Sequence, residues 1–212
     1  MNLPKLIIVA CSAIGLASCG NKPSKLVADP QQGNNTPSVL VSKPQPRKSG
    51  RTFADWCRQK ADLSSETKHT VEVLLKEAGT TDCDAANQKL SSLTALFLTD
   101  TQIGDIKPLA SLTNLTFLNL INNQIGDIKP LASLTNLTQL NLNNNKISDI
   151  KPLVSLTKLE FLYLKNNLLN DIKPLVSLTN LKQFYLSGNQ IAPKTCPLKP
   201  ESICKWEPQP KP

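Results

Sequence analysis

Residues 115–136 of the chain read LTFLNLINNQIGDIKPLASLTN. Nearly the same letters return at 137–158 and 159–180, an earlier copy occupies 93–114, and a truncated copy, LKQFYLSGNQI, occupies 181–191. Each copy begins 22 residues after the previous one, without insertion or deletion. A fixed period of this length is typical of a solenoid, in which each repeat is one structural unit that stacks on the next.

Each repeat contains a short strand followed by a turn. Around two central leucines, inward and outward positions alternate, which predicts a β-strand, and successive strands should pair as a parallel sheet. The segment Asp-Ile-Lys-Pro-Leu that follows should form 3₁₀ turns, with Asp127 as the cap and Pro130 at the first helical position. Four apolar positions are expected to point inward and form a continuous core: Leu115, Leu118, Leu120, Ile125 and their counterparts one period on.

The recurring pattern Leu-x-x-Leu-x-Leu-x-x-Asn-x-Ile resembles the leucine-rich repeat of the 22-residue type seen in bacterial internalins. The resemblance covers roughly half of the chain. It implies an α/β solenoid with a short parallel sheet on the concave face, 3₁₀ or irregular turns on the convex face, and a helical cap before the first strand. It also implies that the Asn of each repeat is buried and bonds to the backbone of the turn. These residues are Asn123, Asn145, Asn167 and Asn189, with Thr101 at this position in the first copy.

The first residues predict export. After Lys5, residues 6–17 form an apolar run that is too short to span a membrane and suits a signal peptide. The run ends in Leu16-Ala17-Ser18-Cys19, which resembles the lipobox of bacterial lipoproteins, where cleavage precedes the Cys and its thiol is acylated. We therefore expect a signal peptide at 1–18 and a lipid on Cys19 that anchors the chain to the periplasmic or outer face of a bacterial membrane. An ordinary secretory signal is the alternative.

Residues 19–52 are rich in Pro, Ser and Lys and poor in large apolar side chains, so we expect a disordered tether. Between residues 20 and 51 there are six basic residues and one acid, and the tether therefore carries much of the formal net charge of +8. Such charge serves solubility and spacing, or attracts anionic lipid or cell-wall polymer. Nucleic acid is not an expected partner of an exported chain.

Both ends of the solenoid need caps, because a terminal repeat has no neighbour to cover its hydrophobic end. Residues 53–92 are predicted to form a helical N-terminal cap, whose central helix begins after Ser64 and ends before Gly79. Residues 192–212 should form a C-terminal cap and a Pro-rich tail, with Trp206 covering the last repeat.

Besides Cys19, the mature chain is expected to keep four cysteines. Five stacked strands would separate the two caps by roughly 20 Å, whereas the Cα atoms joined by a disulfide lie within about 7 Å. The predicted disulfides are therefore Cys57–Cys83 and Cys196–Cys204, one in each cap. A metal site is the alternative, but it has neither Cys-x-x-Cys spacing nor a nearby His to support it.

The outward strand positions vary from repeat to repeat and should line the concave face. Five of the seven Phe and Tyr residues fall on these positions, and exposed aromatic side chains gathered on one face mark a binding surface. Cross-strand packing that stiffens the sheet is the alternative. The predicted ligand-binding residues are Phe97, Phe117, Asn119, Ile121, Gln139, Asn141, Asn143, Phe161, Tyr163, Lys165 and Tyr185.

Catalytic chemistry is not expected. The sequence offers no set of nucleophile, base and orienting residue, no metal cluster and no phosphate loop, so neither enzymatic activity nor a cofactor is predicted. His69, the single histidine, lies in the predicted cap helix without catalytic partners. The sequence predicts an exported, lipid-anchored leucine-rich repeat module that binds a protein partner through its concave face. The alternative is a structural protein of the cell envelope that binds peptidoglycan or another glycan or anionic polymer.

Overall fold

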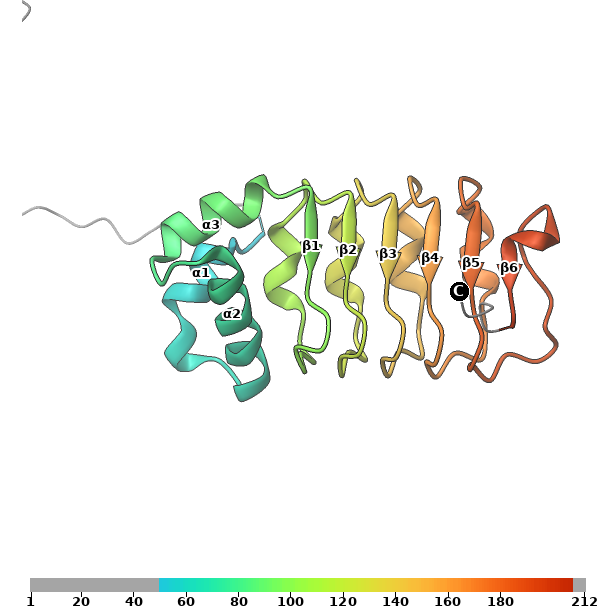
Figure 1. The fold of residues 1–212 in the computed structure, drawn as a ribbon, viewed down its shortest axis with the longest axis horizontal. Coiled ribbons are helices and arrows are strands. Elements are labelled where there is room, and N and C mark those ends of the chain that lie inside the picture. Colours follow the sequence, from blue (N-terminus) through green and yellow to red (C-terminus); the bar gives the residue numbers. More distant parts are fainter. Residues whose placement is uncertain (1–49, 208–212) are drawn as a thin grey trace, which may run out of the picture. The chain divides into compact units, whose positions relative to one another are not determined.

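The computed structural model describes residues 50–207. The predicted signal peptide, Cys19 and nearly all of the predicted tether lie outside the described residues, as do residues 208–212. The described part begins with three α-helices and continues with six parallel strands in the order β1 to β6 (Figure 1). None of the helices in this part is both long and apolar enough to cross a membrane.

Three capped α-helices precede the repeats: α1 (Phe53–Arg58), α2 (Ser65–Ala78) and α3 (Cys83–Ser92), with a 3₁₀ turn at Lys60–Asp62. The Ser64 hydroxyl accepts a hydrogen bond from the N–H of Thr67 at the start of α2. At its end, Gly79 adopts a positive φ of 67°, a conformation that suits glycine at a helix terminus. Helix α2 therefore has the bounds that the sequence predicts.

The helical cap is bonded to the first repeat. Phe53, Leu74 and Leu90 are fully buried and continue the core of the repeats. The hydroxyl of Thr67 donates to the carboxylate of Asp105 at 2.5 Å, and that of Thr70 donates to the backbone carbonyl of Asp105 at 2.7 Å. The Cys57–Cys83 disulfide joins α1 to α3.

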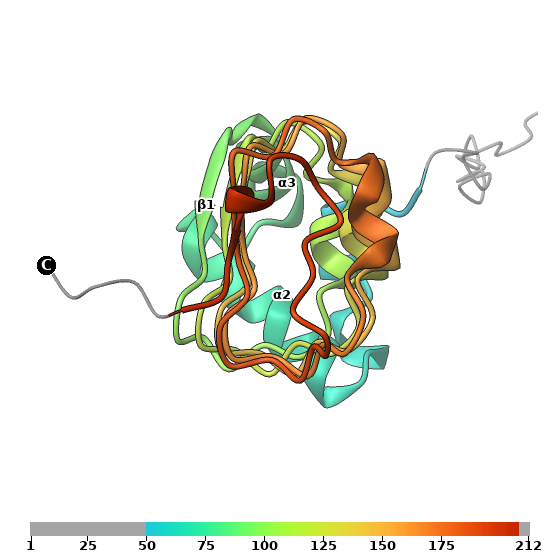
Figure 2. The same cartoon turned by 90° about the vertical axis from the view of Figure 1, so that its right-hand side faces the viewer.

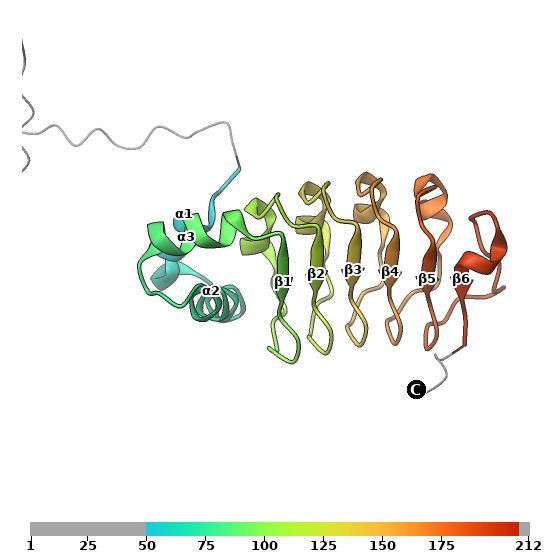
Figure 3. The same cartoon turned by 45° about the horizontal axis from the view of Figure 1, so that its top comes forward.

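The strands lie side by side at one-repeat intervals (Figure 3). In the ladder between β2 and β3, Leu118 pairs with Leu140 and Asn119 with Asn141, so equivalent positions form rows across the sheet. The 3₁₀ helices occupy the opposite side of the coil, as a view along the repeats shows (Figure 2). The strands are β1 (Ala95–Phe97), β2 (Phe117–Asn119), β3 (Gln139–Asn141), β4 (Phe161–Tyr163), β5 (Gln183–Tyr185) and β6 (Cys204–Lys205). The 3₁₀ helices of the repeats are η2 (Lys107–Ser111), η3 (Lys129–Ser133), η4 (Lys151–Ser155) and η5 (Lys173–Ser177).

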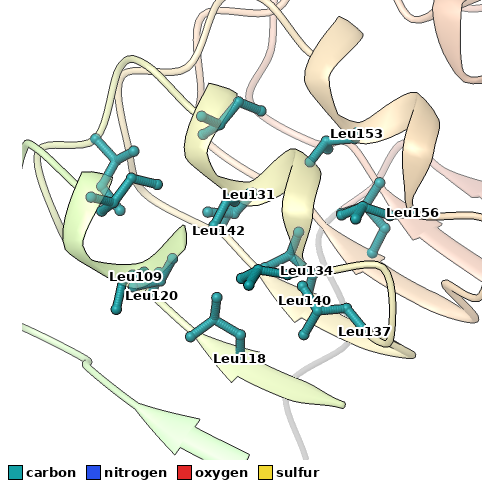
Figure 4. Close-up of a cluster of buried hydrophobic side chains, with 14 of the residues drawn as sticks. Leu109, Leu118, Leu120, Leu131, Leu134, Leu137, Leu140, Leu142, Leu153 and Leu156 are labelled. Atoms are coloured by element: carbon teal, nitrogen blue, oxygen red, sulfur yellow. The ribbon is translucent and has the colours of Figure 1, made fainter. Parts of the chain in front are cut away.

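Leucines from both sides of the coil fill its interior (Figure 4). Leu118 comes from the strand and Leu131 and Leu134 from the 3₁₀ side, and all three are fully buried. Burying one such side chain contributes about 1.5–3 kcal/mol. The same positions are filled in every full repeat, so the core runs through the stack without a break.

The predicted bonding of the repeated Asn is confirmed, and three of the four are buried, whereas Asn189 is half-buried. Asn145 donates from its amide nitrogen to the carbonyls of Leu120 and Leu142, at 2.9 and 3.1 Å. Its amide oxygen accepts from the N–H of Ile125 at 3.0 Å. One side chain therefore satisfies backbone groups in its own repeat and in the preceding one. Thr101 makes fewer bonds: its hydroxyl lies 3.1 Å from the Leu98 carbonyl and 3.0 Å from the amide oxygen of Asn123.

The convex turn differs slightly from its prediction. The capping position of η3 is Ile128, and Asp127, one residue earlier, accepts a hydrogen bond from the N–H of Lys129 at 2.9 Å. Pro130 is thus the second helical residue rather than the first. The short side chain of Asp127 can bond to the backbone N–H two residues ahead, a pattern that is common for Asp.

The C-terminal cap adds a strand that no pattern in the sequence predicts. β6 pairs in parallel with β5, with Tyr185 opposite Lys205. Leu198, Ile203 and Cys204 are the buried side chains of this cap, whereas Trp206 is half-buried. The predicted cover by Trp206 is therefore provided mainly by other residues. The Cys196–Cys204 disulfide links this strand to the segment before it.

Candidate binding surface on the concave face

The pleat of the strands decides which side chains reach the concave face. Leu118 and Leu140 point into the core, and the residues on either side of each point outward. The register places the outward residues of the strands in two rows, and the residues just after the strands form a third. The first row is Ala95, Phe117, Gln139, Phe161 and Gln183; the middle row is Phe97, Asn119, Asn141, Tyr163 and Tyr185; the third row is Thr99, Ile121, Asn143, Lys165 and Ser187.

Two aromatic residues form an apolar patch at the N-terminal end of this face. The rings of Phe97 and Phe117 pack with their centroids 4.9 Å apart and their planes tilted by 36°. Phe97 is nevertheless 57% exposed, the highest value among the large apolar residues of the strands. Contact with its neighbour therefore does not cover this side chain, and its apolar surface stays open to a partner.

The tyrosines at the other end serve partly as cross-strand partners. Tyr163 and Tyr185 stack with centroids 4.8 Å apart and planes 4° apart. Tyr185 is only 7% exposed, so the expectation that it stands open on the face is wrong. The unpredicted strand β6 explains this burial, because it adds Lys205 beside Tyr185. The hydroxyl of Tyr185 donates to the amide oxygen of Gln183 at 2.6 Å.

Asparagine amides occupy the centre of the face. The amide oxygen of Asn119 accepts from the N–H of Ile121 at 3.1 Å, and that of Asn141 accepts from the N–H of Asn143 at 3.2 Å. The amide oxygen of Asn143 in turn accepts from the N–H of Lys165 at 2.8 Å. These bonds hold the side chains in fixed orientations over the sheet.

Lys165 supplies positive charge at this centre. Its ammonium nitrogen lies 5.2 Å from the centroid of the Tyr185 ring, within reach of a cation–π contact. Burial, and to a lesser degree Tyr185, raises the pKa of the neighbouring Tyr163 phenol above its ordinary value of 10.0. The Tyr163 hydroxyl is therefore protonated at neutral pH and can donate a hydrogen bond.

The sequence-predicted binding residues lie on or just after the strands of this face, but they do not form one uniform patch. Phe97 is open, Phe117, Asn119, Ile121, Gln139, Asn141, Asn143, Phe161, Tyr163 and Lys165 are half-buried, and Tyr185 is buried. Outside them, Lys205 also reaches this face, although no pattern in the sequence predicts it. It carries no repeat signature, and its place on the face follows only from the pairing of β6 with β5.

A groove on the other side of the molecule is also open. It has a volume of about 750 Å³ and lies between the start of α1 and the turns η2 and η3. Trp56 and Pro130 line it, and the guanidinium carbon of Arg51 lies 3.6 Å above the Trp56 ring. The Arg51 side chain thus already covers one face of the indole.

Metal-ligating side chains do not cluster in the described part of the chain. No cluster of three or more His, Cys, Asp or Glu side chains suited to a metal occurs between residues 50 and 207. His69 is exposed, and its ring nitrogen Nε2 lies 2.7 Å from the backbone carbonyl of Thr101. This contact adds one more bond between α2 and the first repeat.

Comparison with known proteins identifies the repeat. A family model described as leucine-rich repeats in two copies matches residues 91–133, 113–155, 135–177 and 157–199. No curated protein matches the chain.

Two solved internalin structures from Listeria monocytogenes resemble the fold. Internalin C2 is 46% identical over 56% of this chain and 52% of its own chain, with a TM-score of 0.52. The internalin InlF is 28% identical over 58% of this chain and 44% of its own, with a TM-score of 0.50. The match thus spans about half the length of each relative. The chain belongs to the leucine-rich repeat family, and its repeats are those of a bacterial internalin-like protein.

Proposed function

We propose that this chain is an exported, lipid-anchored module that binds a protein partner through its concave face. Leucine-rich repeat proteins are typically interaction modules rather than enzymes, and the stacked repeats offer one extended surface. The observation that carries the proposal is the open Phe97–Phe117 patch beside a row of asparagine amides. Exposed aromatic side chains next to polar groups are the usual anchors of a protein interface.

The disulfides support an extracytoplasmic location. Both bridges, Cys57–Cys83 and Cys196–Cys204, are formed, and such bonds persist in oxidising compartments outside the cytoplasm. Anchoring by a lipid rests on the sequence around Cys19. Two or more acyl chains would hold the module at a membrane surface while the tether spaces the repeats away from it.

Capture from a cell-envelope extract, with chemical crosslinking, tests the concave face. Phe97→Ala/Phe117→Ala should weaken the affinity for the partner by at least about tenfold, because the anchor residues of an interface contribute about 2 kcal/mol or more. The matched control is Val154→Ser/Val176→Ser, which alters the two exposed valines of the convex turns. Equal capture by the wild type and the Phe variant would refute binding through this face.

The lipid anchor has its own test. Cells that express the wild type or Cys19→Ser are labelled with an alkyne fatty acid, and the membrane fraction is separated. We expect the label and membrane retention only with Cys19. Equal labelling of the wild type and Cys19→Ser, or an unlabelled wild type that still sediments with membranes, would exclude acylation at this residue.

A second candidate function is binding of an anionic envelope polymer through the tether. The basic residues between 20 and 51 favour it, because clustered positive charge attracts polyanions. Sedimentation with purified cell wall, with and without residues 20–52, separates this function from the first. Retention that depends on those residues and disappears at high salt would favour the polymer.

A further inference from the structure

The amides at the centre of the concave face have only one free end. Asn119 and Asn141 accept backbone N–H groups two residues ahead, and Asn143 accepts that of Lys165 in the next repeat. A backbone N–H can only donate, so the oxygen of each amide must face it. This fixes the orientation of all three side chains, which the amide alone would leave ambiguous.

The nitrogen ends of these amides therefore remain for a partner. Within residues 50–207, none of the three Nδ2 groups has a protein acceptor. The register places Asn119 beside Asn141, and Asn143 lies one row away with Lys165 as its neighbour. The Lys165 ammonium forms no ion pair with a described carboxylate and lies over the Tyr185 ring. The centre of the face thus presents hydrogen-bond donors and a positive charge.

Acidic side chains near this centre are few among the described residues. Glu160, the residue before β4, is paired with Lys182 at 2.7 Å. Asp100 follows β1 at the opposite end of the sheet from Lys165 and Lys205. The face therefore runs from an apolar patch at β1 and β2 to a donor-rich, positively charged region over β3 to β6.

We infer that the partner presents an acidic segment whose carboxylate lies over Asn143 and Lys165, with an apolar side chain on the Phe97–Phe117 patch. A carboxylate accepts several hydrogen bonds at once and so matches a cluster of donors, and charge-assisted bonds are stronger than neutral ones. Two strand spacings separate the patch from the Asn143–Lys165 pair, roughly 10 Å. About three residues of extended peptide span that distance.

A protein segment suits this arrangement better than a polyanionic polymer. A repeating polyanion needs a track of cations, and the outward rows of the described strands contribute only Lys165, with Lys205 at the edge. The apolar patch would have no counterpart on such a polymer. The inference rests on the proposed function and adds the chemistry of the segment that the concave face recognises.

A displayed library of random 12-residue peptides, selected on the immobilised full-length mature protein, tests the inference without knowledge of the natural partner. We expect enrichment of Asp or Glu about three residues from an aromatic or aliphatic residue. A synthetic peptide of the enriched sequence should lose about tenfold or more in affinity when its acid is replaced by the amide. Lys165→Glu should weaken the same peptide by a similar factor, and added salt should weaken binding to the wild type.

The matched control is Lys151→Glu, because Lys151 is an exposed lysine on the convex turn η4. It should leave peptide affinity within about twofold of the wild type. Both variants should keep the wild-type midpoint in urea.

The outcomes test the acidic segment and binding through the concave face separately. Peptides that depend on Phe97 and Phe117 but are not acidic, or that bind Lys165→Glu as well as the wild type, would overturn the acidic segment and leave the concave-face function intact. Peptides indifferent to both Phe and Lys changes would overturn both. Lys165-dependent binding of soluble teichoic acid, with no enriched peptide, would replace the protein segment by an anionic polymer.

Discussion

At the scale of single residues, the buried asparagines illustrate how one side chain can link two repeats. The carbonyl of Leu120 accepts from both Asn123 and Asn145, at 3.0 and 2.9 Å. The N–H of Ile125 depends on Asn145 alone among side chains. The same contacts recur one period on, so the period of the sequence is also the period of its internal hydrogen bonds.

Asn145→Ala tests this ladder. It would leave the buried N–H of Ile125 without its acceptor and should cost at least about 2 kcal/mol in the free energy of unfolding. Urea unfolding with the disulfides intact measures the loss. The control is Asn180→Ala, an exposed residue whose amide donates to the Thr157 carbonyl, where the loss should stay below about 1 kcal/mol. Equal losses in the two variants would contradict the special role of the buried ladder.

The environment of Asp105 predicts that the stability of the contact between the cap and the first repeat depends on pH. Burial raises its pKa, but hydrogen bonds from Thr67 and Lys107 outweigh burial, and the pKa lies below its ordinary value of 3.8. A carboxylate whose pKa is lower in the folded than in the unfolded state stabilises the fold when it is ionised. This contribution is fully present above the pKa of the unfolded state and is lost as the pH falls through the pKa of the folded state.

We therefore expect Asp105→Asn to lower the melting temperature at pH 7. The difference in melting temperature between this variant and the wild type should narrow below about pH 4. Melting curves recorded from pH 7 to pH 2 measure it. Asp149→Asn, at the same repeat position but exposed, should show a smaller difference at every pH. If the melting-temperature difference for Asp105→Asn does not change with pH, ionised Asp105 is not the source of the pH-dependent stability.

At the scale of elements, the two caps are closed by disulfides of unequal span. Cys57–Cys83 encloses a sequence separation of 26 residues and Cys196–Cys204 one of 8. The longer loop removes more freedom from the unfolded chain, by about 1 kcal/mol in the loop-entropy model. Each bridge also holds a segment that would otherwise fray from the end of the stack.

Paired Cys→Ala variants test this difference. Cys57→Ala/Cys83→Ala should lose about 2–4 kcal/mol, and Cys196→Ala/Cys204→Ala should lose about 1 kcal/mol less. Reversible urea unfolding of the two double variants provides the comparison. A larger loss at the C-terminal bridge would show that contacts in the folded state, such as the pairing of β6, outweigh loop entropy.

At the scale of the whole described molecule, one core joins the helical cap, the repeats and the C-terminal cap. Each repeat contributes a layer that is complete only when the next layer covers it. The last strand with repeat character, β5, carries Phe184 and is followed by Leu186, and both are buried because β6 and its loop lie against them. Stability at this end therefore depends on a segment outside the repeat.

Truncation after Ile191 should expose that layer. We expect the shortened protein to associate or precipitate, because a large uncovered apolar surface favours aggregation. Light scattering after size-exclusion chromatography measures the state. Truncation after Glu207 keeps every described contact and should leave elution unchanged. A monodisperse monomer that ends at Ile191 would contradict the need for the cap.

The sequence by itself determined the repeat unit, the inward leucines and the bounds of α2. These features depend on periodicity and on local capping, which are written in consecutive residues. Even the disulfide pairing followed, because the length of the stack keeps the two caps apart.

Only the tertiary structure decided how the concave face is composed. Cys204 and Lys205 have no repeat pattern, so their pairing with β5 depends on where the last layer leaves an open edge. That pairing buries Tyr185 and adds Lys205 to the face. The direction of the amides of Asn119, Asn141 and Asn143 likewise depends on backbone N–H groups that the fold brings within reach. Side-chain identity is local, whereas the burial and free hydrogen-bonding groups of a side chain depend on its neighbours in space.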